Sequence, residues 1–122
     1  MKLMCLLKRK PGMSPREFRD YYETVHAPLA TRLLPFFSAY RRNYMIDEEA
    51  EVADHVEAPA AAPEIDVITE FVFETRADYE KMVAAFSDPA IAGEIADDEE
   101  RFLDRNAIRI FFVDEVATPV AR

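Results

Sequence analysis

The sequence has little of several residue types on which binding and catalytic sites are commonly built. Its 122 residues include two glycines, two histidines, one cysteine and no tryptophan. A single cysteine cannot form an internal disulfide, which fits a reducing compartment. Gly12 and Gly93 are too few for a glycine-rich phosphate loop, and His26 and His55 lack the usual spacing of a zinc site. We therefore expect neither a cofactor nor a metal ion.

Long apolar runs are also missing. No stretch approaches the roughly 18 apolar residues that a membrane span needs, and residues 3–7 are too short for a signal-peptide core. The formal net charge is −9, with acidic residues concentrated at 47–64 and 94–104. An acidic surface repels phosphate backbones. These features predict a cytoplasmic protein that binds neither nucleic acid nor a membrane.

Residues 1–122 are predicted to form a single domain that contains one segment of different character. Apolar residues make up 50% of the chain and charged residues 32%, which is typical of a globular domain. Residues 47–64 are acidic, rich in alanine and proline, and without a dominant periodicity. Two interpretations of this long loop insertion remain open, namely a lid or binding element and a disordered, solubilising insertion. Residues 97–100 are also acidic, lack the calcium-loop pattern, and are expected to form a solvated helix face.

The order of the predicted elements is β-α-β-β-α-β, which is the ferredoxin-like arrangement. Apolar, β-branched and aromatic residues predict four strands, at residues 2–8, 36–46, 65–74 and 106–113. This arrangement places the strands in one antiparallel sheet and both main helices on the same face of it. The predicted fold class is therefore α+β.

Helix boundaries are predicted from capping signals. The first main helix begins at Ser14-Pro15-Arg16-Glu17, which combines a capping box with a proline at the first helical position, and it ends at Pro35. Thr75 or Asp78 is expected to cap the second main helix. Two further helical pieces are predicted, a short helix starting at 87–89 and a helical turn at 96–103.

Three strand segments are apolar on both faces, at 3–7, 67–73 and 107–113. Two helices cover only one face of a sheet, and the other face would expose an apolar patch larger than monomers tolerate. A second copy of the chain is the simplest cover. We therefore predict a homodimer, a dimeric α/β barrel around an apolar pocket, and the sequence leaves open which sheet face lines the pocket.

Several segments together resemble the EthD family of dimeric α/β-barrel proteins. They are residues 7–18, residues 21–29 with their His-x-Pro-Leu motif, residues 87–89 and residues 98–104. The third strand departs from the family pattern, because Phe71-Val72-Phe73 replaces an aromatic pair that often ends in Trp-Phe. The resemblance implies the ferredoxin-like dimeric barrel. It also implies a role in ether-degradation gene clusters or in polyketide-type pathways, where members act as cofactor-independent dehydratases, cyclases or decarboxylases.

His26 is the first candidate for chemistry. It lies at one edge of the apolar stripe of the first helix, one turn beyond Tyr22. Pro28 removes the amide that would bond the carbonyl of Thr24, and a helix broken there can aim the imidazole into a cleft. An imidazole with a pKa of about 6.5 can serve as acid or base near neutrality. The structural interpretation also remains open, in which the ring binds a carbonyl freed by Pro28 or caps the helix end.

Tyr22, Tyr40, Arg42 and Tyr44 are candidates of second rank. The last three alternate along the second strand and therefore share a face. On the cavity side they would offer phenol and guanidinium donors to a developing enolate or phenolate oxygen. On the solvent side they would be ordinary residues of an edge strand.

Two other residues have both a functional and a structural interpretation. Asp66 opens the third strand, where it could orient His26 or merely terminate the preceding loop. Cys5 lies inside an apolar strand, which favours a buried small hydrophobe over a nucleophile.

These observations favour a cofactor-independent lyase, dehydratase or cyclase that processes a small aromatic or polyketide-like metabolite. His26 would be the acid or base, and the Tyr/Arg face of the second strand would stabilise negative charge. The alternative is a non-catalytic dimer that binds a small hydrophobic or aromatic ligand, or assists a partner oxygenase. A dimer whose core is simply filled by side chains is the third possibility.

Overall fold

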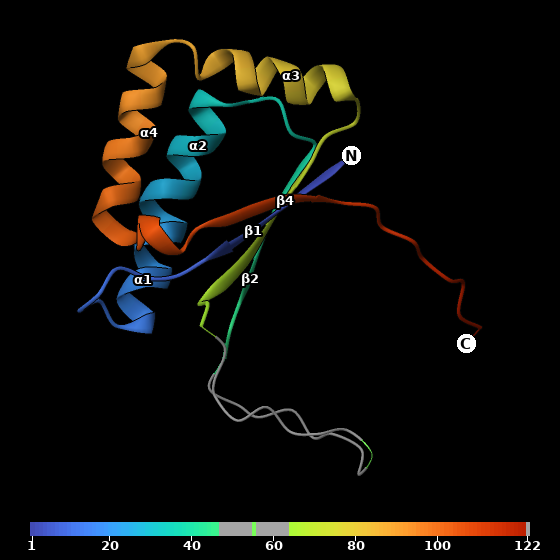
Figure 1. Cartoon of the computed structure of the whole chain (residues 1–122), viewed down its shortest axis with the longest axis horizontal. Coiled ribbons are helices and arrows are strands. Elements are labelled where there is room, and N and C mark those ends of the chain that lie inside the picture. The colour runs from blue at the N-terminus through green and yellow to red at the C-terminus, as the bar shows by residue number, and fades with distance from the viewer. Residues whose placement is uncertain (47–54, 56–63, 122) are drawn as a thin grey trace.

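The computed structural model describes residues 1–46, 55 and 64–121 (Figure 1). The predictions for the acidic segment 47–64 fall almost entirely outside the described residues. The strands are β1 (Lys2–Leu7), β2 (Ala39–Tyr44), β3 (Val67–Val72) and β4 (Arg109–Val113). The helical elements are α1 (Pro15–Tyr21), the π-helical turn η1 (Tyr22–His26), α2 (Ala27–Leu33), α3 (Arg76–Ala85), α4 (Pro89–Phe102) and the 3-10 turn η2 (Arg105–Ala107).

The four strands form one antiparallel sheet in the order β2-β3-β1-β4, and the helices lie on one side of it (Figure 1). This order confirms the predicted ferredoxin-like, α+β fold. Among the described residues, none of the helices has the length and apolar character that crossing a bilayer requires.

The first helical segment begins where its capping signals predict, but its backbone before Pro28 departs from a regular α-helix. Ser14 accepts a hydrogen bond from the amide of Glu17, and the Glu17 side chain accepts one from the amide of Ser14. The turn before Pro28 is disturbed, as the sequence indicates, but the helix is not broken there. The chain instead forms the π-helical turn η1, in which the amide of Ala27 bonds the carbonyl of Tyr22 before α2 continues. One extra residue in the turn shifts the register of the helix, which accommodates the proline without ending the helical path.

The C-terminal half of the helix layer also differs from the prediction. The two separate pieces expected after residue 87 are one helix, α4, of 14 residues. Asp88 caps it by accepting a hydrogen bond from the amide of Ala90, and Pro89 occupies the first helical position. Ile95 and Phe102 bury one face of α4 against the core, so packing holds the acidic turn in the same helix. Thr75, one of the two predicted caps, is the N-cap of α3.

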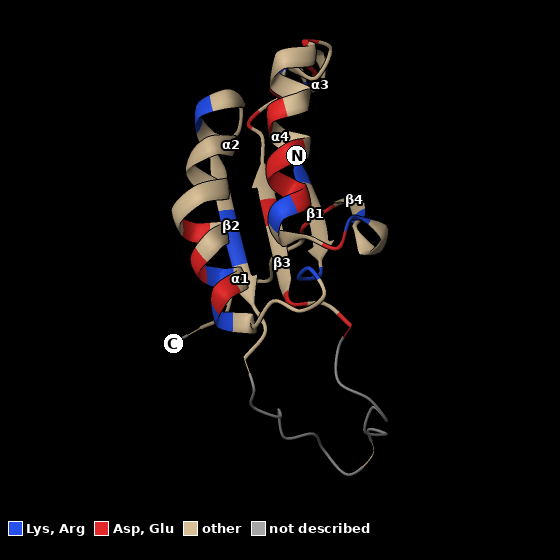
Figure 2. Ribbon diagram, turned by 90° about the vertical axis from the view of Figure 1, so that its left-hand side faces the viewer, with Lys and Arg blue, Asp and Glu red and all other residues tan. Residues whose placement is uncertain are grey.

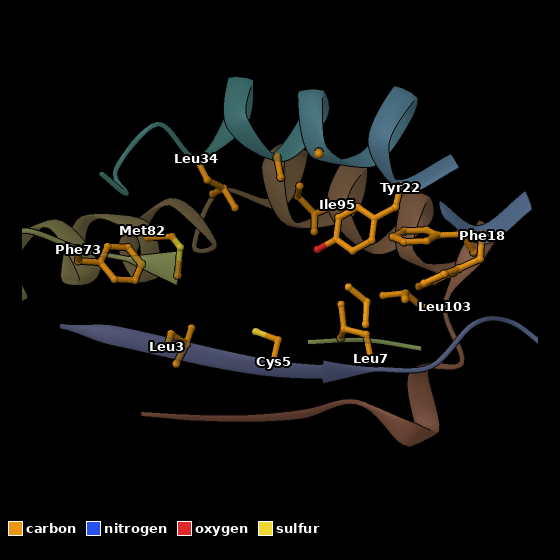
Figure 3. Close-up of a cluster of buried hydrophobic side chains, with 14 residues drawn as sticks. Leu3, Cys5, Leu7, Phe18, Tyr22, Leu34, Phe73, Met82, Ile95 and Leu103 are labelled. Atoms are coloured by element: carbon orange, nitrogen blue, oxygen red, sulfur yellow. The ribbon is translucent and has the colours of Figure 1, made fainter. Parts of the chain in front are cut away.

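The core lies between the sheet and the helices (Figure 3). Leu3, Cys5 and Leu7 alternate along β1 and point into it, as the period of two in a strand requires. The register pairs Leu3 with Phe71, and Phe71 with Tyr40. Paired residues share a face of a sheet, so the Tyr/Arg face of β2 is the face that the helices cover.

The opposite face of the sheet has no cover among the described residues. It carries two kinds of side chain, apolar Met4, Leu6, Ile68, Val72 and Phe111, and polar Lys2, Arg41, Asn43, Glu70 and Arg109. Lys2 and Glu70 form an ion pair of 2.9 Å across β1 and β3. The uncovered face is thus less uniformly apolar than the sequence suggests, and the homodimer stays a prediction.

Candidate functional site

A cavity of about 170 Å³, partly open to solvent, lies between the sheet and the helix layer of the single chain. The cavity is formed by one copy of the chain, whereas the sequence predicts a pocket within a dimeric barrel. Most of its lining is apolar, from β1, α2, α3 and α4. Four lining side chains can do chemistry: Cys5, Tyr22, His26 and Glu99. An apolar cavity with a few convergent polar groups is typical of sites for small molecules.

The imidazole of His26 is held by a carboxyl group from α4. Nδ1 of His26 lies 2.8 Å from Oδ2 of Asp98, which is only 2% exposed. The other oxygen of Asp98 accepts a hydrogen bond from the hydroxyl of Tyr21, and Nη1 of Arg101 lies 3.4 Å from it. These contacts fix the carboxyl group, which in turn fixes the ring of His26. The structural interpretation, in which His26 binds a backbone carbonyl, is not what the structure contains.

The environment of His26 favours its neutral form. Burial lowers the pKa of His26 below its ordinary value of 6.5, and the hydrogen bond to Asp98 offsets only part of this effect. In the neutral ring, the contact with Asp98 places the proton on Nδ1 and the lone pair on Nε2. Nε2 has no hydrogen-bond partner among the described residues. Every fully buried side-chain nitrogen of these residues does have a partner, so Nε2 is not fully buried. Nε2 is therefore accessible, on a ring that lines the cavity, and can accept a proton.

Tyr22 presents a phenol to the same cavity. Its hydroxyl lies 2.9 Å from Oγ1 of Thr69 and accepts a hydrogen bond of 2.9 Å from the hydroxyl of Tyr40. Burial raises the pKa of Tyr22 to about 12. The phenol stays protonated near neutrality, so it can donate a hydrogen bond but does not serve as a base. Figure 3 shows this hydroxyl in the space between the helix layer and the sheet.

Arg42 supports this phenol from outside the cavity. Its Nε and Nη2 each lie 2.8 Å from a carboxylate oxygen of Glu23, and its guanidinium carbon lies 4.5 Å from the centre of the Tyr40 ring. The hydroxyl of Tyr44 also bonds Glu23. Because of these partners, chiefly Arg42, the pKa of Glu23 falls to about 2. The predicted Tyr/Arg face is present, but Arg42 does not line the cavity, and its guanidinium carbon lies 5.8 Å from the centre of the Tyr22 ring as well.

Asp66 is not the partner of His26. It binds Arg9 instead, through a backbone contact of 2.8 Å and a side-chain contact of 2.8 Å. Of the two interpretations of Asp66, the one in which it orients His26 is therefore excluded, because Asp98 is the carboxyl partner of His26. Cys5 is buried, and burial raises the pKa of its thiol to about 12. The thiol stays protonated, as expected for a small hydrophobe.

Sequence reasoning missed Asp98 and Glu99, because they stand in a run of four acidic residues that is typical of a solvated helix face. Figure 2 shows the acidic residues of α4 among the other charged residues. One signal was present in the sequence. Asp98 falls between Ile95 and Phe102 at helical spacing, which places its carboxyl group on the apolar stripe of α4.

The topology and the cavity define a small ferredoxin-like α+β domain with a largely apolar cavity that carries a few polar groups. The chain belongs to the EthD domain family, which matches residues 10–106. The conidial pigment biosynthesis dehydratase EthD of Metarhizium robertsii is 29% identical to it over 123 residues, which cover 93% of this chain and 84% of that protein.

Solved structures agree with this assignment at the level of the fold. An ethyl tert-butyl ether d (EthD) family protein of Bacillus halodurans superposes with a TM-score of 0.60 at 17% identity, over 94% of this chain and 97% of that one. An EthD-like protein of Ralstonia eutropha JMP134 has a TM-score of 0.56 at 17% identity, over 90% and 87%. A protein of Arabidopsis thaliana has a TM-score of 0.56 at 13% identity, over 98% of both chains.

Proposed function

We propose that this protein is a cofactor-independent enzyme that dehydrates a small, hydroxylated aromatic or polyketide-like metabolite by acid–base chemistry. The observation that carries the proposal is the contact of His26 with buried Asp98, which leaves Nε2 accessible on a ring that lines the cavity. The largely apolar lining suits an aromatic or polyketide-like molecule. The few polar groups are of the types that proton transfer needs.

His26 is the base in this proposal. Nε2 takes a proton from a carbon atom next to a carbonyl group of the substrate, and the ring becomes an imidazolium. The carboxylate of Asp98, 2.8 Å from Nδ1, stabilises the new positive charge and keeps the ring in the required tautomer. A positioned base of this kind contributes about 10²–10⁴-fold to a rate.

Tyr22 is the donor to the oxygen that becomes negative. Removal of the proton moves charge onto the carbonyl oxygen of the substrate, and a phenol that stays protonated can stabilise it. Tyr40 and Thr69 hold the Tyr22 hydroxyl in place. Tyr40 is thus a positioning residue, and so is Arg42, whose guanidinium lies over the Tyr40 ring.

The name of the Metarhizium robertsii relative favours dehydration among the reactions that such a base can start. Cyclisation and carbon–carbon cleavage also begin with proton transfer, so the same residues would serve them. A non-catalytic protein that only binds a small aromatic ligand would use the same cavity. Binding and turnover must therefore be measured separately.

The test uses the aldol of benzaldehyde and acetone, a β-hydroxyketone that becomes a conjugated, ultraviolet-absorbing enone when it loses water. We expect the protein to accelerate this reaction and His26→Gln to lose the acceleration by about 10²-fold or more. Calorimetric titration with the enone measures binding apart from turnover. We expect His26→Gln to bind the enone nearly as well as the unchanged protein.

The matched control is His55→Gln, which removes the other histidine at an exposed position. It should leave turnover unchanged. If the protein binds the enone but never forms it from the aldol, the binding function replaces the enzymatic one. If His26→Gln turns over the aldol normally, His26 is not the base.

A further inference from the structure

Glu99 is a second ionisable group at the cavity, and the mechanism above does not use it. It follows Asp98 on α4, and about 100° of helix rotation separates consecutive side chains, so Asp98 reaches His26 while Glu99 lines the cavity. Its carboxyl group has no hydrogen-bond partner among the described residues. Every fully buried side-chain oxygen of these residues does have a partner, so the carboxyl oxygens of Glu99 are not fully buried. The carboxyl oxygens of Glu99 are thus accessible, on a side chain that lines the cavity.

We propose that Glu99 is the catalytic acid of the cavity, which donates a proton to the hydroxyl group that leaves the substrate while His26 removes the proton from carbon. This inference rests on the proposed function. It assigns each half of an elimination to its own side chain. The two groups come from different elements, Glu99 from α4 and His26 from η1, and both line one cavity of about 170 Å³.

The surroundings of Glu99 raise the pKa of its carboxyl group, which favours the protonated form more than in an exposed glutamate. Burial raises its pKa above the ordinary value of 4.5, Arg105 lowers it, and the neighbouring charge of Asp98 raises it again, with a net increase. When it is ionised, Glu99 also adds to the rise in the pKa of Cys5. Cys5 points from β1 into the core beneath the helices (Figure 3), and it lines the same cavity as Glu99.

The step balances without an external reactant. The carbon–hydrogen bond breaks as its proton moves to Nε2 of His26, and its electron pair forms the carbon–carbon double bond. The carbon–oxygen bond breaks, and its electron pair leaves with the hydroxyl oxygen, which takes the proton of Glu99 and departs as water. His26 ends protonated and Glu99 ends ionised, and proton exchange with solvent restores both.

A general acid matters only when the leaving group needs a proton, and this gives the test its selectivity. The aldol of benzaldehyde and acetone loses hydroxide, a poor leaving group, whereas the β-fluoro counterpart loses fluoride and yields the same enone. We expect Glu99→Gln to lower kcat/KM for the aldol by about 10²-fold or more and to leave kcat/KM for the fluoroketone nearly unchanged. His26→Gln should lower both.

Two further variants support the comparison. Glu100→Gln removes the adjacent, exposed acid of the same helix and should change neither rate. Glu99→Asp keeps an acid with a shorter reach and should fall between the unchanged protein and Glu99→Gln with the aldol. Equal thermal unfolding midpoints for these variants show that each of them folds.

The outcomes separate the two proposals. If His26→Gln loses both reactions while Glu99→Gln keeps the aldol reaction, the role of Glu99 is overturned and the proposed function stands. Equal losses with aldol and fluoroketone in Glu99→Gln would also overturn it, because they indicate a structural or binding role. If the unchanged protein accelerates neither reaction, the proposed function fails and the role of Glu99 fails with it.

Discussion

Nδ1 of His26 and Oδ2 of Asp98 lie 2.8 Å apart although 72 positions separate the two residues in the sequence. The π-helical turn η1 brings the imidazole to α4, and the apolar stripe of α4 brings the carboxyl group to the imidazole. The pair is buried, so neither group exchanges partners freely with water. This relationship makes the tautomer of His26 a consequence of the fold, and the tautomer decides whether Nε2 can act as a base.

Asp98→Asn should therefore remove activity, although the two side chains have nearly the same shape. The amide nitrogen of asparagine can donate to Nδ1 and thereby move the ring proton to Nε2, where it blocks proton abstraction. We expect turnover of the aldol to fall by about 10²-fold or more. Nitrogen NMR shifts of His26 report the tautomer directly. Asp97→Asn, an exposed neighbour on the same helix, should change neither turnover nor shifts, and an unaltered tautomer in Asp98→Asn would contradict the mechanism.

The pKa of His26 predicts how stability depends on pH. The folded-state pKa lies below the ordinary value of 6.5, so the folded protein binds this proton less readily than the unfolded chain. The contribution of His26 to stability is fully present above the pKa that this residue has in the unfolded chain. It is lost as the pH falls from that value through the lower pKa of the folded protein. Urea unfolding at about pH 8 and about pH 5 should show a loss of stability that is smaller in His26→Gln. An identical loss in both proteins would exclude His26 as its source.

Much of the fold could be predicted from local signals. The capping box at Ser14 and the alternation along β1 depend on nearby residues, and both are present in the structure. The backbone at Pro28 could not be predicted, because a π turn and a broken helix both accommodate the missing amide. The π turn η1 contacts α4, an element far away in the sequence. Packing against the core joins the two predicted pieces of α4 into one helix, since Ile95 and Phe102 bury a common face.

The site was predicted in part. The alternation of Tyr40, Arg42 and Tyr44 correctly places them on one face, but only the register of β2 against β3 shows that the helices cover this face. The partner of His26 could not be predicted from spacing, because a contact across 72 positions depends on how two helices pack. An acidic residue on an apolar stripe, as Asp98 is, was the one available signal.

Tyr22→Phe tests the proposed donor to the developing negative charge. The change removes one hydroxyl from the cavity and leaves the hydroxyls of Tyr40 and Thr69 without this partner. We expect kcat for the aldol to fall by about 10²–10³-fold, and the free energy of unfolding to fall by about 1–3 kcal/mol. Tyr40→Phe should have a smaller effect on kcat, since it acts through Tyr22. A larger loss of kcat in Tyr40→Phe than in Tyr22→Phe would reverse the assigned roles.

The homodimer can be tested on the uncovered face of the sheet. Phe111 lies on this face and is 44% exposed in the single chain, among half-buried Met4 and Leu6 of the adjacent strand. If a second copy covers the face, Phe111→Lys places a charge in the interface and shifts the protein toward monomers, which sedimentation equilibrium measures directly. Val83→Lys is the matched control, because Val83 is 48% exposed but lies on α3, in the helix layer. A protein that sediments as a monomer at micromolar concentration, before any change is made, would contradict the predicted homodimer while leaving the cavity inside the single chain intact.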